Sequence, residues 1–266
     1  MTTAIVGAGV HARTYGDGPP LVLFHSLLSD SASFDAVMPR LAERSTVIVP
    51  DLPGFGGSPA IGGELTDVAD HMAAFLETIA PGDAVTLFGN GYGAFVALQI
   101  ALRHPDRVAS LMLAGCGARF SDPGREAFRN MAAIGRTRGL AAVADTAMAR
   151  LFAPDFQAAH PDLMAERRAA FLRTDIAVFE QACLSLATLD LTQQVGDLAM
   201  PVLMMVGDQD AATPPAMATE FVQLVSAADL RILPHCAHVP PLQAPDLVIE
   251  AIIEFLDRHS HGHELT

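Results

Sequence analysis

The feature that most constrains the fold is an alternation of short apolar runs with segments of helical period. The apolar runs have strand length and lie at residues 21–24, 46–49, 85–88, 110–114, 202–206 and 230–233. Segments with helical spacing of apolar residues include 34–41, 68–79 and 246–258. Apolar strands that alternate with helices are typical of a mostly parallel sheet with helices on both faces. The sequence therefore predicts an α/β protein with such a sheet.

A helical insertion interrupts this alternation. Residues 119–194 contain no strand-like run and carry helical sequence rich in Ala, Arg, Met and Phe, broken at Pro154 and Pro161. We therefore expect a core formed by residues 1–118 and 195–266, and a helical cap formed by residues 119–194. Ligands of open parallel sheets bind beyond the carboxyl ends of the strands. A cap inserted after a central strand would cover that edge and leave a cleft beneath it.

Composition excludes several classes of partner and cofactor. The 266 residues carry a net charge of -14, which argues against general binding to nucleic acid or to anionic membranes. No run reaches the roughly 18 uncharged apolar residues of a membrane helix. The three cysteines, Cys116, Cys183 and Cys236, are far apart and show no disulfide or metal-ligand spacing. We expect a cytoplasmic protein that needs no metal or cofactor and acts on a small molecule; the sequence leaves a homo-oligomer open.

Four segments that can carry chemistry each follow a predicted strand. They are residues 25–28, 89–93, 207–210 and 236–240. The second reads Gly-Asn-Gly-Tyr-Gly between a strand and a helix, which is the setting of the nucleophile elbow G-x-S-x-G. Gly91 occupies the position of the serine. The chain order of elbow, acid and histidine is that of the α/β hydrolases.

On these residues the chain resembles the α/β-hydrolase superfamily over nearly its whole length, and within it most resembles the 3-oxoadipate enol-lactonases and related esterases. The phrases that carry the resemblance lie at residues 25–27, 51–58, 104–108, 151–156 and 207–215. The resemblance implies hydrolysis of a lactone or ester. It also implies that His238 is the general base, that Asp210 orients it, and that the backbone N–H groups of Leu27 and Tyr92 form an oxyanion hole. Asp208 competes with Asp210 for the acid role, but the Gly-x-x-Asp spacing favours Asp210.

Further residues are candidates for the pocket. His25, Ser26 and Phe152 are candidate substrate-binding residues, although His25 is also a candidate for a structural role in its loop. Residues 51–56 are expected to border the pocket, and Cys116 is a candidate surrogate nucleophile. An anionic substrate would need a cation, for which the cap offers several arginines at positions that helical spacing cannot rank. They are Arg119, Arg125, Arg129, Arg136, Arg138, Arg150, Arg167, Arg168 and Arg173.

Gly91 leaves three functions open. The first, which we favour, is a lactone or ester hydrolase whose serine-type turnover is absent or impaired, through natural divergence or an engineered change. Glycine suits the sparsely populated backbone conformation of the elbow, so the fold would survive the change. The second is general-base chemistry by His238 and Asp210 without a covalent intermediate, such as direct attack by water, a lyase step or an isomerase step. The third is a ligand-binding relative without turnover.

Overall fold

The computed structural model describes residues 3–259, and its strands form one eight-stranded sheet. The order across the sheet is β1-β2-β4-β3-β5-β6-β7-β8. The strands are β1 (Thr3–Gly7), β2 (Val10–Tyr15), β3 (Pro20–Phe24), β4 (Thr46–Pro50), β5 (Val85–Asn90), β6 (Val108–Ala114), β7 (Val202–Gly207) and β8 (Ala228–Leu233). Strand β2 pairs antiparallel with β1 and β4, and the other neighbours are parallel. The predicted α/β architecture with a mostly parallel sheet is confirmed.

The six apolar runs of the sequence correspond to β3 through β8, whereas the hairpin of β1 and β2 was not predicted. A two-residue turn at Ala8 and Gly9 joins these strands, and both residues have positive φ angles of 50° and 78°. This pattern is that of a tight type I′ hairpin turn. Strand β2 alternates between buried Val10 and Ala12 and more exposed neighbours, which weakens its apolar signal.

Helices cover both faces of the sheet because successive residues of its strands point to opposite faces. Along β3, Val22 and Phe24 belong to one apolar core, and Leu21 and Leu23 belong to the other. The helices around the sheet are α1 (Met38–Leu41), α2 (Leu65–Ile79), α3 (Tyr92–Arg103), α9 (Pro215–Leu224), α10 (Pro240–Gln243) and α11 (Pro245–His259).

The helix expected at residues 34–41 is shorter in the structure. A 3-10 turn, η1 (Ser31–Phe34), precedes α1, which covers only Met38–Leu41. Pro39 lies in the first turn of α1, where its missing N–H costs no hydrogen bond. The amphipathic pattern of this segment therefore reflects burial of Phe34 and Leu41 rather than one continuous helix.

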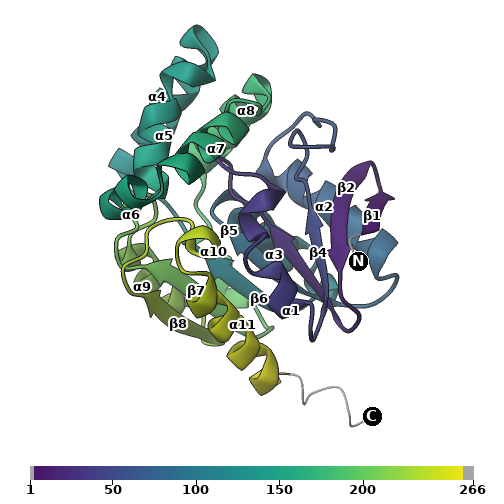
Figure 1. Cartoon of the computed structure of the whole chain (residues 1–266). Helices are drawn as coiled ribbons and strands as arrows, with labels where there is room; N and C mark the ends of the chain where they lie inside the picture. Colours follow the sequence, from purple (N-terminus) through teal and green to yellow (C-terminus); the bar gives the residue numbers. More distant parts are fainter. Residues whose placement is uncertain (1–2, 260–266) are drawn as a thin grey trace.

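Five helices lie between β6 and β7 and gather on one side of the molecule (Figure 1). They are α4 (Asp122–Arg138), α5 (Ala144–Leu151), α6 (Pro154–Ala159), α7 (Pro161–Phe171) and α8 (Ile176–Thr188). The two prolines that break the helical pattern are the first residues of α6 and α7, a position that proline favours. Within residues 3–259, no helix is both long and apolar enough to cross a membrane.

Candidate active site

The turn between β5 and α3 has the geometry of a nucleophile elbow. Gly91 lies in it with φ 54° and ψ -120°, a conformation that residues with a side chain rarely adopt. A Cβ on Gly89 would lie 2.4 Å from the Cα of Ala94, and a Cβ on Gly93 would lie 2.3 Å from the carbonyl oxygen of Phe24. The flanking glycines therefore let the strand, turn and helix pack closely.

Residue 91 faces two polar side chains from other parts of the chain. A Cβ on Gly91 would lie 2.8 Å from Nε2 of His238 and 2.5 Å from Oγ of Ser26. Ser26 follows β3, and His238 follows β8. Three segments that are distant in the sequence therefore meet at one point beyond the carboxyl ends of their strands.

His238 is paired with a buried carboxylate. Its Nδ1 lies 2.8 Å from Oδ2 of Asp210. The other oxygen of Asp210 accepts hydrogen bonds from the backbone N–H groups of Ala212 and Thr213, and the Thr213 hydroxyl donates to Oδ2. Burial alone would raise the pKa of Asp210, but the charge of His238 and these hydrogen bonds outweigh it and leave the pKa lowered.

The ionised state of Asp210 determines the protonation of the imidazole. A carboxylate only accepts hydrogen bonds, so Nδ1 of His238 carries the proton that is shared with Asp210. In the neutral ring, Nε2 then has a free lone pair, and this atom is the one that faces Gly91. His238 is therefore oriented to take a proton from a group that stands beside residue 91.

Several contacts that the sequence analysis missed hold the histidine in place. The side-chain amide of Asn90 donates to the backbone oxygen of His238 at 2.9 Å, and the N–H of His238 donates to the backbone oxygen of Leu151 at the end of α5. A Cβ on Gly115, which has φ 64°, would lie 2.9 Å from the imidazole ring. Thr213 was also missed, although an Asp followed three residues later by Thr is a common side-chain-stabilised turn.

Two backbone N–H groups at the site are available to a ligand. Tyr92 is the first residue of α3, and Leu27 lies in the loop after β3; both residues line the pocket. Across residues 3–259, neither amide has a protein acceptor. Free N–H groups beside a base are the arrangement that stabilises an oxyanion.

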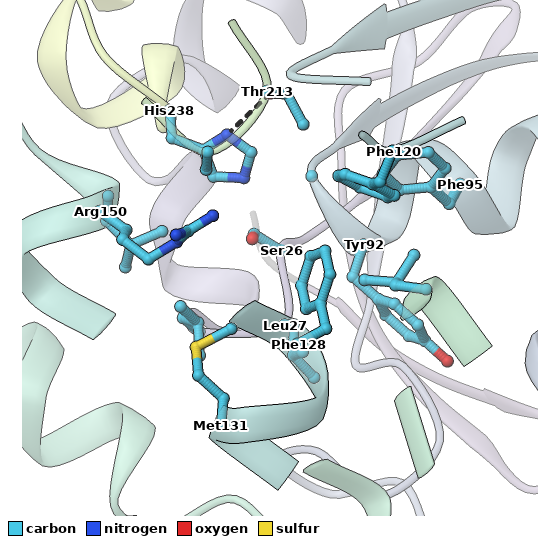
Figure 2. A pocket seen from close by; sticks show the side chains of 15 residues that line it. Ser26, Leu27, Tyr92, Phe95, Phe120, Phe128, Met131, Arg150, Thr213 and His238 are labelled. Carbon is cyan, nitrogen blue, oxygen red and sulfur yellow. Dashed lines mark hydrogen bonds between the residues drawn. The ribbon is translucent and has the colours of Figure 1, made fainter. Parts of the chain in front are cut away.

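The pocket around these groups is small and mostly apolar (Figure 2). Its free volume is about 40 Å³, which is room for a few water molecules. The lining residues are Ser26, Leu27, Leu28, Gly91, Tyr92, Phe95, Phe120, Phe128, Met131, Arg150, Leu151, Leu186, Ala212, Thr213 and His238.

Two expected substrate-binding residues lie outside this lining, which corrects those expectations. His25 is fully buried, and burial lowers its pKa. Its Nδ1 donates to the backbone oxygen of Ser26 at 3.0 Å, while Nε2 accepts from the N–H of Leu52 at 3.1 Å. Both ring nitrogens are thus bonded to backbone groups, one in the loop after β3 and one in the loop after β4, as the structural alternative required. Phe152 is buried and stacks on Phe156 in the helical layer.

Three further candidates also lie away from the pocket. Burial raises the pKa of the Cys116 thiol, which packs in the apolar core and, among residues 3–259, has the neighbouring carbonyl of Gly117 as its hydrogen-bond acceptor. Cys116 therefore lacks the thiolate character of a nucleophile. Asp208 is exposed and accepts from the N–H of Cys236 instead of contacting His238. Residues 51–58 form their own hydrogen-bonded loop and do not border the cavity.

Comparison with known proteins defines the class of this chain. Residues 19–245 match the family described as alpha/beta hydrolase fold, and the chain belongs to that family. Its order of elbow, acid and histidine agrees with this assignment.

The relatives by sequence include pimeloyl-[acyl-carrier protein] methyl ester esterases. The protein from Aeromonas hydrophila is 30% identical over 93% of this chain and 99% of its own length. The protein from Photobacterium profundum is 29% identical over 96% of this chain and 100% of its own length. These names support an esterase type of hydrolase.

Solved structures of hydrolases share the fold. A thermophilic esterase from Thermogutta terrifontis is 27% identical, with a TM-score of 0.87 over 97% of this chain and 99% of that protein. The enol-lactonase from Burkholderia xenovorans LB400 is 24% identical, with a TM-score of 0.88 over 96% of this chain and 100% of that protein. The expected likeness to enol-lactonases is thus found at the level of the fold.

Proposed function

We propose that this chain hydrolyses small esters or lactones, with His238 as the general base, Asp210 as its partner, and no nucleophile at residue 91. The observation that carries the proposal is the position of Nε2 of His238, which lies 2.8 Å from the point where a Cβ of residue 91 would stand. Among residues 3–259, this nitrogen has no hydrogen-bond partner. Its other nitrogen is bonded to a buried carboxylate. Glycine has no hydroxyl, so serine-type turnover through residue 91 is absent.

The chemistry requires three contributions from the chain. The N–H groups of Leu27 and Tyr92 would donate to the carbonyl oxygen and stabilise its negative charge in the transition state. Nε2 of His238 would take the proton of the attacking hydroxyl and return it to the leaving oxygen. Asp210 would stabilise the imidazolium that forms in between. Direct attack by water is the simplest course, and residues 119–194 would act as the cap that limits access of bulk solvent.

Arg150 supports a substrate that carries a carboxylate. Seven of the nine arginines in the proposed cap form ion pairs with acidic side chains, namely Arg119, Arg125, Arg129, Arg136, Arg167, Arg168 and Arg173. In the part of the chain that the structure describes, Arg150 has no such partner, and it is the one Arg or Lys that lines the pocket (Figure 2). A guanidinium in a mostly apolar pocket favours a carboxylate ligand. We infer a monoester of a short dicarboxylic acid, or a lactone that bears a carboxylate.

The test is a substrate screen on the unmodified chain and matched variants. p-Nitrophenyl butyrate, monomethyl esters of dicarboxylic acids and carboxylated enol lactones would be assayed with the unmodified chain, His238→Ala and Asp210→Asn. We expect both substitutions to lower kcat/KM at least about 100-fold, as is typical for loss of general-base catalysis. Hydrolysis that survives His238→Ala unchanged would overturn the proposal. Ligand binding by calorimetry without hydrolysis of any ester would instead favour the non-catalytic alternative.

Arg150→Gln tests the substrate class separately. This variant should raise KM for the carboxylated esters and leave KM for p-nitrophenyl butyrate unchanged. An equal effect on charged and neutral esters would show that Arg150 does not select the carboxylate.

A further inference from the structure

We propose that Ser26 is the nucleophile of this chain and that its hydroxyl replaces the one that Gly91 cannot supply. The inference rests on the proposed hydrolase function and names the residue that forms the covalent intermediate. It replaces direct attack of water on the substrate by attack of water on an acyl-Ser26.

The position of the hydroxyl is the first argument. Ser26 Oγ lies 2.5 Å from the point where a Cβ of residue 91 would stand, and Nε2 of His238 lies 2.8 Å from the same point. The hydroxyl therefore lies next to the space that the side chain of an elbow serine would fill. Figure 2 shows the Ser26 oxygen directed into the pocket that His238 also faces.

The absence of a competing partner is the second argument. Within residues 3–259, no side chain or backbone group forms a hydrogen bond with Ser26 Oγ. The hydroxyl can therefore rotate about χ1 to donate to His238 when a substrate is bound. Hydrogen bonds of a catalytic group are often long before the substrate arrives and shorten in the complex.

The support of the main chain is the third argument. The carbonyl oxygen of Ser26 accepts two hydrogen bonds, from Nδ1 of His25 at 3.0 Å and from the N–H of Ser29 at 3.1 Å. His25 is in turn fixed by the N–H of Leu52. His25 is thus a positioning residue, because it holds the backbone from which Ser26 projects.

The oxyanion donors suit attack from this position. The N–H of Leu27 directly follows Ser26 in the chain, just as the N–H of Tyr92 directly follows residue 91. In α/β hydrolases the residue after the nucleophile supplies one donor, and the loop after an earlier strand supplies the other. Moving the nucleophile from residue 91 to Ser26 exchanges these two roles and keeps both donors.

The proposed reaction is balanced in two half-reactions. Nε2 of His238 takes the proton of Ser26 Oγ as Oγ bonds to the carbonyl carbon; the C–O bond to the alcohol then breaks, and the alcohol leaves with that proton. Water next attacks the acyl carbon and gives its proton to Nε2. The bond to Oγ breaks, Oγ takes the proton back, and the carboxylic acid is released. The reaction needs no reagent besides the ester and water.

Covalent labelling tests the inference directly. The intact chain would be treated with a fluorophosphonate, which phosphonylates activated serines, and the labelled peptide would be located by mass spectrometry. Because residue 91 has no hydroxyl, we expect the label on Ser26. Ser26→Ala and His238→Ala should each lower labelling at least about 100-fold.

Ser29→Ala is the matched control. Ser29 lies on the same loop, and its buried Oγ has no partner among the described residues. The substitution keeps the backbone N–H that bonds the Ser26 carbonyl and removes only this oxygen, so labelling should stay unchanged. Circular dichroism and thermal unfolding of each variant confirm that it is folded. A label on another residue, or labelling that survives Ser26→Ala, would overturn the inference.

Partitioning of the intermediate is the second measurement. If an acyl-Ser26 forms, two esters with the same acyl group and different alcohols should give the same ratio of methyl ester to acid when methanol is added. A ratio that depends on the alcohol would indicate direct attack by water and would overturn the role of Ser26. Ester hydrolysis that survives Ser26→Ala but is lost in His238→Ala would reject Ser26 as the nucleophile and keep the proposed hydrolase function. The absence of any ester hydrolysis by the unmodified chain would reject the proposed function itself.

Discussion

The substitution Gly91→Ser places a hydroxyl beside His238. It should raise kcat/KM for ester hydrolysis and lower the stability of the fold. The backbone at residue 91 has φ 54° and ψ -120°, which costs a residue with a side chain about 1–3 kcal/mol. For a domain of this size we expect the thermal midpoint to fall by roughly 2–4 °C for each kcal/mol. The new Cβ would also lie 2.5 Å from Ser26 Oγ and 2.8 Å from His238 Nε2, so Ser26 must rotate and the imidazole must shift against the contacts that hold it, which adds to this cost.

The expected gain in rate follows from the parts already present. In Ser-His-Asp hydrolases, loss of the nucleophile lowers kcat on the order of a millionfold. The rate that remains is still about 10³–10⁴ times that of the reaction in water, because the oxyanion hole and substrate binding are kept. Because the Ser26 hydroxyl must move aside for the new side chain, we expect only part of that factor. A gain of about 10²–10⁴ in kcat/KM corresponds to about 3–5 kcal/mol of transition-state stabilisation.

The assay compares Gly91→Ser with Gly91→Ala, using p-nitrophenyl butyrate hydrolysis and thermal unfolding. Gly91→Ala carries the same backbone strain without a hydroxyl, so its midpoint should fall similarly and its rate should not rise. A folded Gly91→Ser variant with no gain would refute the placement of His238 opposite residue 91. A gain in Gly91→Ala would refute the role assigned to the new hydroxyl.

Two further substitutions test the surroundings of the site, and a third tests an ion pair at the carboxyl end of α3. A Cβ on residue 115 would lie 2.9 Å from the His238 ring, so Gly115→Ala should displace the imidazole. We expect kcat to fall while KM changes little; an unchanged kcat would contradict the position of the His238 ring beside Gly115. Asn90→Ala removes the hydrogen bond to the backbone oxygen of His238, so urea unfolding should show a loss of about 1–3 kcal/mol; no loss would mean that the bond is absent in solution. The hydrogen bond to Arg103 lowers the pKa of the Asp70 carboxylate to about 2. Asp70 therefore contributes to the free energy of unfolding when the pH is above the ordinary pKa of an aspartate, and this contribution is lost as the pH falls toward 2. Because Asp70 is 40% exposed, Asp70→Asn should cost at most about 1 kcal/mol at pH 6 in urea unfolding and flatten the loss below pH 4; a larger loss on acidification in the variant would contradict the sign.

The parts of the fold that depend on local sequence could be predicted. Near-continuous apolar runs such as residues 85–88 form buried parallel strands wherever helices cover both faces, so their position follows from composition alone. The elbow could also be predicted, because the approach of strand and helix restricts residues 89 and 93 to glycine. The hairpin of β1 and β2 escaped prediction because the apolar run of β1 covers only residues 4–6, and β2 alternates apolar with polar residues.

The parts of the site that depend on the direction of a side chain could not be predicted. His25 and Ser26 are neighbours, yet His25 turns into the protein to bind backbone groups while Ser26 lines the pocket. Nine arginines lie in residues 119–194, and only the fold shows that Arg150 lines the pocket while seven others form ion pairs. Periodicity gives the face of a helix, but it does not say which neighbour that face will meet.

The energetic cost of the His238–Asp210 pair argues for retained chemistry. Burying a carboxylate costs several kcal/mol unless hydrogen bonds and an opposite charge compensate for it. Asp210 is 3% exposed, and four donor groups of its loop and of His238 are committed to it. A pocket that only binds ligands gains nothing from such a pair, since apolar residues of similar volume are often as stable or more so. The arrangement is useful when a proton must be taken from a hydroxyl beside residue 91 and then given back.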